Sequence, residues 1–218
     1  MKLARIAAAL AMASVSTTAA APPENDPMLE IAQAWDHARY TVNEEDDRGA
    51  ELHQLGDVID KQIAVHANDP NLLIWRAIIL AGEADAIDGP TALPLAWRAK
   101  HLLEQAGTLN PDSASACAMH TTLGMLYARV PGFPLAFGDR HLAETHLRRG
   151  LAIEPNGIEA NFFYGVFLID ERRFRAALPF LHKVLDWHPR PERTVGDAGM
   201  GRAAAALLTD AEQQLFSR

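Results

Sequence analysis

Four prolines recur in matching contexts, and this recurrence constrains the fold more than any other feature of the sequence. They are Pro70, Pro111, Pro155 and Pro189, separated by 41, 44 and 34 residues. Each follows one amphipathic stretch and precedes another. Because proline ends one helix or begins the next, each is expected to mark a junction between helices. A period of this size is typical of a stack of similar structural units.

Small and large apolar residues stand at fixed distances before the last three prolines. Alanine lies twelve residues before each proline and leucine eight residues before it. These residues are Ala99, Ala143 and Ala177, with Leu103, Leu147 and Leu181. A spacing of four keeps each pair on one helix face, and the small residue allows a close helix crossing. The first unit departs from this register, with an apolar stripe formed by Leu52, Leu55, Ile59 and Ile63.

The first helix of two units carries a second pattern. Leu123-Gly124-Met125-Leu126-Tyr127 has the form L-G-x-x-Y, and Tyr164-Gly165-Val166-Phe167-Leu168 is a close variant. With the registered alanine, leucine and proline positions, this resembles the tetratricopeptide (TPR) repeat. The resemblance implies an all-α, antiparallel helix-pair solenoid of about four repeats with a C-terminal capping helix. The repeats are expected at about 27–70, 71–111, 112–155 and 158–191, within 22–191, and the cap within 192–218.

Periodicity and capping residues predict where the individual helices lie. Asp26, Asp112 and Asp139 are expected to cap helix N-termini, because a carboxylate there accepts hydrogen bonds from free backbone N–H groups. The expected helices span 27–43, 48–67, 71–86, 92–108, 112–129, 139–153, 158–171, 173–187 and 195–217.

Residues 1–21 are expected to be a secretory signal peptide. Lys2 and Arg5 precede a short apolar run over residues 6–15, and small residues follow through Ala21. This is typical of a signal cleaved near residues 19–21, with an N-terminal membrane anchor as the alternative. The alanine-rich composition favours a periplasmic location, with no stable membrane span after cleavage. Cys117 is the only cysteine, so no internal disulfide is possible.

The charge and motif content exclude some functions. Twenty basic and 28 acidic residues give a net charge of −8, which argues against a nucleic-acid partner. The sequence contains no G-x-S-x-G, H-E-x-x-H or C-x-x-C motif. We therefore expect neither an enzyme nor a bound cofactor. The acidic run over residues 44–47 is expected to be a solvated loop.

An insertion rich in proline and glycine, residues 130–138, joins the two helices of the third unit. Its two aromatic residues, Phe133 and Phe137, have two interpretations. They form a hydrophobic lip over a binding groove, or both rings pack back on the helices as a small satellite core. Insertions that share one edge of a solenoid are frequently at its binding face.

The first helices of the last two repeats are expected to line a concave surface. Arg129 and Asp170, near helix ends, could fix a polar ligand; the alternative is an ordinary solvated helix face with one ion pair. The candidate partner- or ligand-binding residues, with those of the insertion, are His120, Arg129, Phe133, Phe137, Asn161, Phe162, Tyr164 and Asp170.

Two histidine-containing groups suggest metal binding by composition alone. Cys117 and His120 share a helix face and could hold copper, but free cysteine is more commonly a core residue. His141 and His146 are five apart, which puts them on different sides of a helix and favours a solvated face. We expect no metal site. The glycine-rich segment 196–201 lacks the order and the preceding strand of a nucleotide loop.

Residues 131–202 show a narrower resemblance. Pro131-Gly132-Phe133-Pro134, Asn161-Phe162-Phe163-Tyr164-Gly165 and Pro189-Arg190-Pro191 are similar to the periplasmic T component of TRAP-type solute transporters. That resemblance implies a TPR-type scaffold that contacts a protein partner, the substrate-binding protein of a transport system. The alternative function is a small-molecule or metal carrier that uses the concave groove. The oligomeric state stays open, a homo-oligomer included.

Overall fold

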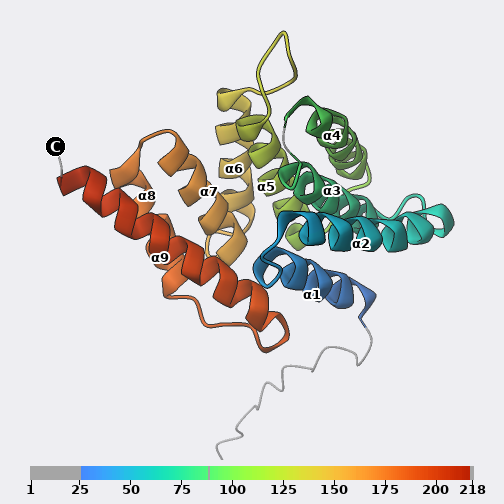
Figure 1. The fold of residues 1–218 in the computed structure, drawn as a ribbon, viewed down its shortest axis with the longest axis horizontal. Coiled ribbons are helices and arrows are strands. Elements are labelled where there is room, and N and C mark those ends of the chain that lie inside the picture. The colour runs from blue at the N-terminus through green and yellow to red at the C-terminus, as the bar shows by residue number, and fades with distance from the viewer. Residues whose placement is uncertain (1–25, 88, 217–218) are drawn as a thin grey trace, which may run out of the picture.

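The computed structural model describes residues 26–87 and 89–216, and the regular elements of this part of the chain are all helices (Figure 1). Its helices begin and end within three residues of the expected positions. They are α1 (Pro27–Tyr40), α2 (Glu45–Val65), α3 (Pro70–Asp85), α4 (Leu93–Thr108), α5 (Ser113–Arg129), α6 (Arg140–Ile153), α7 (Ile158–Asp170), α8 (Phe174–Leu185) and α9 (Thr194–Phe216), with short 3₁₀ helices η1 (Gly89–Ala92) and η2 (Pro191–Arg193). No described helix is long and apolar enough to cross a membrane. The expected signal peptide lies outside the described residues.

Aspartate side chains begin four of the helices. Asp26, Asp112 and Asp139 accept hydrogen bonds from backbone N–H groups in the first turns of α1, α5 and α6, which confirms the predicted caps. Asp69 does the same for α3, which sequence reasoning missed. The acidic run is not the expected loop. Residues 45–47 form the first turn of α2, where the positive end of the helix dipole stabilises carboxylates.

Glycine and alanine bring the two helices of a pair close together. A methyl group added to Gly124 of α5 would lie 2.5 Å from Cγ of Leu147 on α6, and one added to Gly165 of α7 would lie 2.6 Å from Cδ2 of Leu181 on α8. Both leucines are fully buried. The close crossing predicted from the small residues is therefore confirmed for these two pairs.

The first unit follows the alternative stripe that its sequence predicted. Leu52 and Ile59 of α2 are fully buried, and Leu55 and Ile63 pack against the same core. Val58 and Val65, which occupy the register of the other units, are at least half exposed. This helix is therefore rotated relative to the register of the later repeats.

The odd-numbered helices form a closed ring rather than an open stack. Contacts link α1 to α3, α3 to α5, α5 to α7, α7 to α9 and α9 back to α1. Figure 1 shows the start of α9 beside α1, with the rest of α9 running out along α8. The expected cap helix thus packs on the last pair and also joins the two ends of the array.

The junction of α1 and α9 combines a buried ion pair with two close approaches. Arg193 donates hydrogen bonds of 2.5 and 2.7 Å to the two carboxylate oxygens of Asp36, whose side chain is 2% exposed. Gly196 and Gly199 of α9 leave room for the side chains of Asp36 and Tyr40. The glycine-rich segment 196–201 is therefore a helix contact, consistent with the rejection of a nucleotide loop.

Candidate functional site

A cavity of about 700 Å³ lies among α1, α3, α5 and α7. α1, α3, α5 and α7 contribute to its wall, together with η1, the start of α4 and the loop after α5. Most of the lining is apolar, and it includes the aromatic side chains of Trp35 and Phe163 and the thioether of Met125. Cavities of this size and character hold small molecules in other proteins.

Trp35 of α1 reaches the cavity wall because α3 has a glycine opposite it. A methyl group added to Gly82 would lie 2.6 Å from Cζ3 of Trp35. The indole therefore packs directly on the backbone of α3, and both residues line the cavity. This contact fixes one wall of the cavity between the first two helix pairs.

The charged side chains among the described lining residues form one cluster. Arg39, Asp85 and Arg129 lie in the last turns of α1, α3 and α5, and we call them the rim cluster. Nη1 of Arg129 lies 3.0 Å from Oδ1 of Asp85, and Nη2 of Arg39 lies 3.5 Å from Oδ2. Their side chains are between a third and a half exposed. The cluster is therefore part of the wall of the apolar cavity and is also in contact with solvent.

Of the expected site residues, only Arg129 lies in the cavity wall, and its ion-pair partner is Asp85 rather than Asp170. Asp170 is exposed at the last residue of α7. Asn161, Phe162 and Tyr164 are buried in the fold. Nδ2 of Asn161 donates to the carbonyls of Pro155 and Gly157, and the Tyr164 hydroxyl donates to Glu144. These three side chains stabilise the helix packing.

Phe133 and Phe137 take opposite positions, so the packing of both rings on the helices is confirmed for Phe137 and wrong for Phe133. Phe137 packs back on the helices, with its centroid 4.6 Å from that of Trp97 and 5.6 Å from that of Tyr127. Phe133 is 93% exposed, in the loop that projects between α5 and α6 (Figure 1). Leu135 of the same loop is 76% exposed and also lines the cavity. The loop therefore presents apolar surface beside the cavity.

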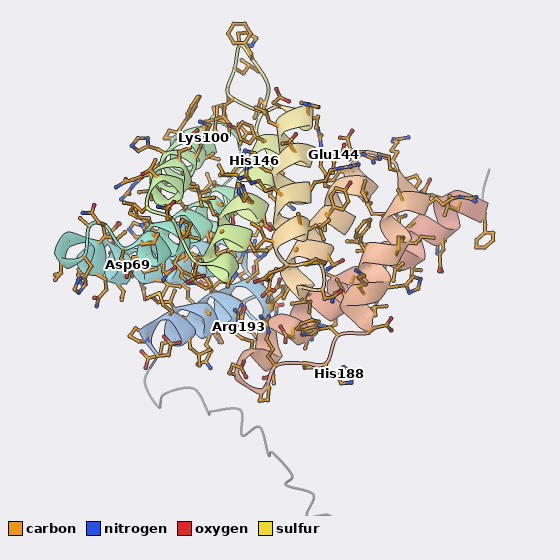
Figure 2. All side chains as sticks on the ribbon, turned by 180° about the vertical axis from the view of Figure 1, so that it is seen from behind. Asp69, Lys100, Glu144, His146, His188 and Arg193 are labelled. Atoms are coloured by element: carbon orange, nitrogen blue, oxygen red, sulfur yellow. The ribbon has the colours of Figure 1, made fainter. Side chains whose placement is uncertain are left out.

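His120 lies outside the cavity, in the interface of α5 and α6. Its Nδ1 is 3.0 Å from Nδ1 of His146, which stacks on Tyr127. Burial, with repulsion from His146 and Arg149, lowers the pKa of His120 to about 4. The expectation of a solvated His146 was wrong: the ring is half-buried and lies near Lys100 of α4 (Figure 2).

Cys117 does not join the histidine pair. Its thiol is buried, lies 3.5 Å from the carbonyl oxygen of Gly150, and has its pKa raised to about 12 by burial. In the described part of the chain, no three His, Cys, Asp or Glu side chains come together as metal ligands could. The cysteine therefore belongs to the packing of α5 against α6.

Sequence reasoning missed most of the cavity lining. Trp35, Arg39 and Asp85 lie in the first half of the chain, where no family motif pointed to a site. Phe163 adjoins the expected Phe162 and makes an edge-to-face ring contact with it, but of the two only Phe163 lines the cavity. A ring formed by distant helices leaves no local pattern that would reveal these residues.

Comparison with protein-family models and with curated proteins finds no match for this chain. The cavity and the loop are therefore the features of this chain that indicate a function.

Proposed function

We propose that this chain is a binding protein that takes a small, largely apolar molecule into the cavity among α1, α3, α5 and α7. The observation that carries this proposal is the volume of about 700 Å³ bounded mainly by apolar side chains. Transfer of an apolar molecule from water to these side chains is favourable, because it removes apolar surface from water and adds packing contacts. The N-terminal sequence supports a periplasmic setting for this carrier.

Filling the cavity tests this function. Ala81 of α3 lines the cavity and is half-buried, so Ala81→Trp should occupy space that a ligand needs. Ala205, exposed on α9 and outside the lining, provides the matched control Ala205→Trp. We expect an environment-sensitive apolar dye to bind the wild-type chain and Ala205→Trp saturably, and Ala81→Trp at least tenfold more weakly.

Equal dye binding by the wild type and both variants would contradict the proposal. Ala84→Trp provides a second filled cavity if Ala81→Trp does not fold, because Ala84 also lines the space and is half-buried. Helical circular dichroism and the urea midpoint verify folding of each variant before dye binding is measured.

A second candidate is a TPR-type scaffold that binds a protein partner, and the exposed loop favours it. Phe133 and Leu135 present large apolar side chains to solvent, which is costly for a protein without a partner at that surface. The resemblance to T components of TRAP-type transporters makes a periplasmic substrate-binding protein the partner that we propose. The same loop borders the cavity, so a bound partner would lie beside its mouth.

The double variant Phe133→Ser, Leu135→Ser tests the scaffold function. We expect the wild-type chain to retain a purified TRAP-type substrate-binding protein from the same cell, and the double variant to lose at least tenfold in affinity. Val58→Ser, Val65→Ser is the matched control, because it removes two exposed apolar side chains from α2, away from the loop. Equal retention by all three proteins would count against this candidate.

A further inference from the structure

The rim cluster carries more positive than negative charge. Arg39 and Arg129 are both cationic at neutral pH, and Asp85 is the one acidic side chain among the described cavity lining. The whole chain, in contrast, has a net charge of −8. The side chains of the rim cluster thus carry a net positive charge, opposite in sign to the chain as a whole.

Asp85 divides its two oxygens between the two arginines. Oδ1 is 3.0 Å from Arg129 and Oδ2 is 3.5 Å from Arg39. Each guanidinium has five N–H donors in a planar fork, so one contact to Asp85 leaves donors for a further acceptor. Holding both side chains on one carboxylate also reduces the rotamer entropy that a ligand would otherwise have to remove.

Helix dipoles explain only part of this cluster. The C-terminal end of a helix favours cations, which accounts for arginine in the last turns of α1 and α5. It does not account for Asp85, an acid at the last residue of α3. The two arginines stabilise Asp85 there, and Asp85 in turn holds them together at the cavity.

We propose that Arg39 and Arg129 bind the carboxylate of an apolar ligand whose body lies in the cavity. This inference rests on the proposed carrier function and names its ligand class: apolar monocarboxylic acids. Arginine binds a carboxylate through paired, charge-assisted hydrogen bonds, which are strong where neighbouring apolar walls exclude water. A cationic head group placed between the same two guanidinium groups would be repelled by them and bind less well.

Three probes with the same tail and different head groups test the ligand class. Decanoate, decanol and decylammonium are titrated by calorimetry into the full chain, below the concentrations at which they form micelles. We expect decanoate to bind about tenfold more tightly than decanol, and decylammonium most weakly. Ala81→Trp should weaken all three, because it acts on the tail.

Charge-removing variants test the residues. Arg129→Gln and, independently, Arg39→Gln should weaken decanoate about tenfold and leave decanol unchanged. The matched control is Arg140→Gln, since Arg140 is an exposed arginine of α6 outside the cavity. It should leave the affinity of every probe as in the wild type.

The results distinguish failure of the carboxylate subsite from failure of the carrier function itself. If none of the three probes binds, the carrier function itself fails. If decanoate and decanol bind equally well and neither arginine variant changes decanoate, the cavity binds apolar molecules but the carboxylate subsite is wrong. Preference for decylammonium would overturn the subsite as well.

Discussion

Gly124 shows at the scale of one residue how closely two helices of a pair approach. A methyl group at this position would meet the Leu147 side chain at 2.5 Å and the Ala143 carbonyl oxygen at 3.1 Å. Neither neighbour can move easily, because Leu147 and Ala143 are fully buried. Gly124→Ala should therefore lower the free energy of unfolding by about 1–3 kcal/mol, measured by urea denaturation.

Gly201 gives the matched control for this prediction. It lies inside α9, and a methyl group there would meet no atom within 4 Å. Gly201→Ala should raise the free energy of unfolding by about 0.5–1 kcal/mol, because alanine loses less backbone entropy in a helix. A stabilising effect of Gly124→Ala similar to that of Gly201→Ala would show that α5 and α6 are less closely packed.

The histidine pair predicts a pH dependence of stability. Burial, together with the charges of Arg149 and Lys100, lowers the pKa of His146, and the pKa of His120 falls to about 4. The unfolded chain, with ordinary histidine pKa values near 6.5, binds protons first as the pH falls. Stability from the neutral pair is therefore full above about pH 6.5 and is lost progressively toward about pH 4.

Urea midpoints at about pH 7 and about pH 5 check this effect. His120→Gln should lose less stability than the wild type between the two, since it removes one of the groups that must stay neutral. His53→Gln is the control, because His53 is exposed on α2, a helix that contacts neither α5 nor α6. A pH response of His120→Gln as steep as that of the wild type would contradict the assignment.

At the scale of helices, the contact of α1 with α9 depends on a buried ion pair. The side chains of Asp36 and Arg193 are 2% and 15% exposed, so removing one charge leaves the other without its partner. Asp36→Asn should lower the free energy of unfolding by about 3 kcal/mol. Glu171→Gln, which breaks the exposed pair with Arg140, should cost less than about 1 kcal/mol. Equal losses in urea denaturation would argue that α1 packs loosely on α9.

Local sequence patterns predicted the positions of the helices, but they did not predict that the odd-numbered helices close into a ring. Pro70 and Asp139 mark helix starts through the chemistry of their own backbone and side chain, so sequence alone located them. Gly196 and Gly199 carry no such signal, because the residues that require them, Asp36 and Tyr40, are about 160 positions away. Arg129 was a candidate because it ends the helix that carries the repeat motif. Asp85 and Arg39 were not candidates, because no local pattern links them to that helix.

At the scale of the whole molecule, the cavity depends on closure of the helix ring, because α1 takes part in both. α1 supplies Trp35 and Arg39 to the cavity wall, and its position is fixed on one side by Gly82 of α3 and on the other by Arg193 and Gly196. Release of α1 would therefore open the ring of helices and, at the same time, remove part of the cavity wall. A ligand that needs the intact wall must therefore oppose that release.

Amide hydrogen exchange can measure this coupling. At a decanoate concentration about 100 times its dissociation constant, opening of α1 should become about 2.7 kcal/mol more costly, which slows exchange there roughly a hundredfold. The first turns of α9 should slow as well, although no α9 residue is among the described cavity lining, because they open with α1. α6, which also lacks lining residues and does not contact α1, is the internal reference and should change little. Protection of α1 without α9 would show that the first helix opens alone and that the ring is not a cooperative unit.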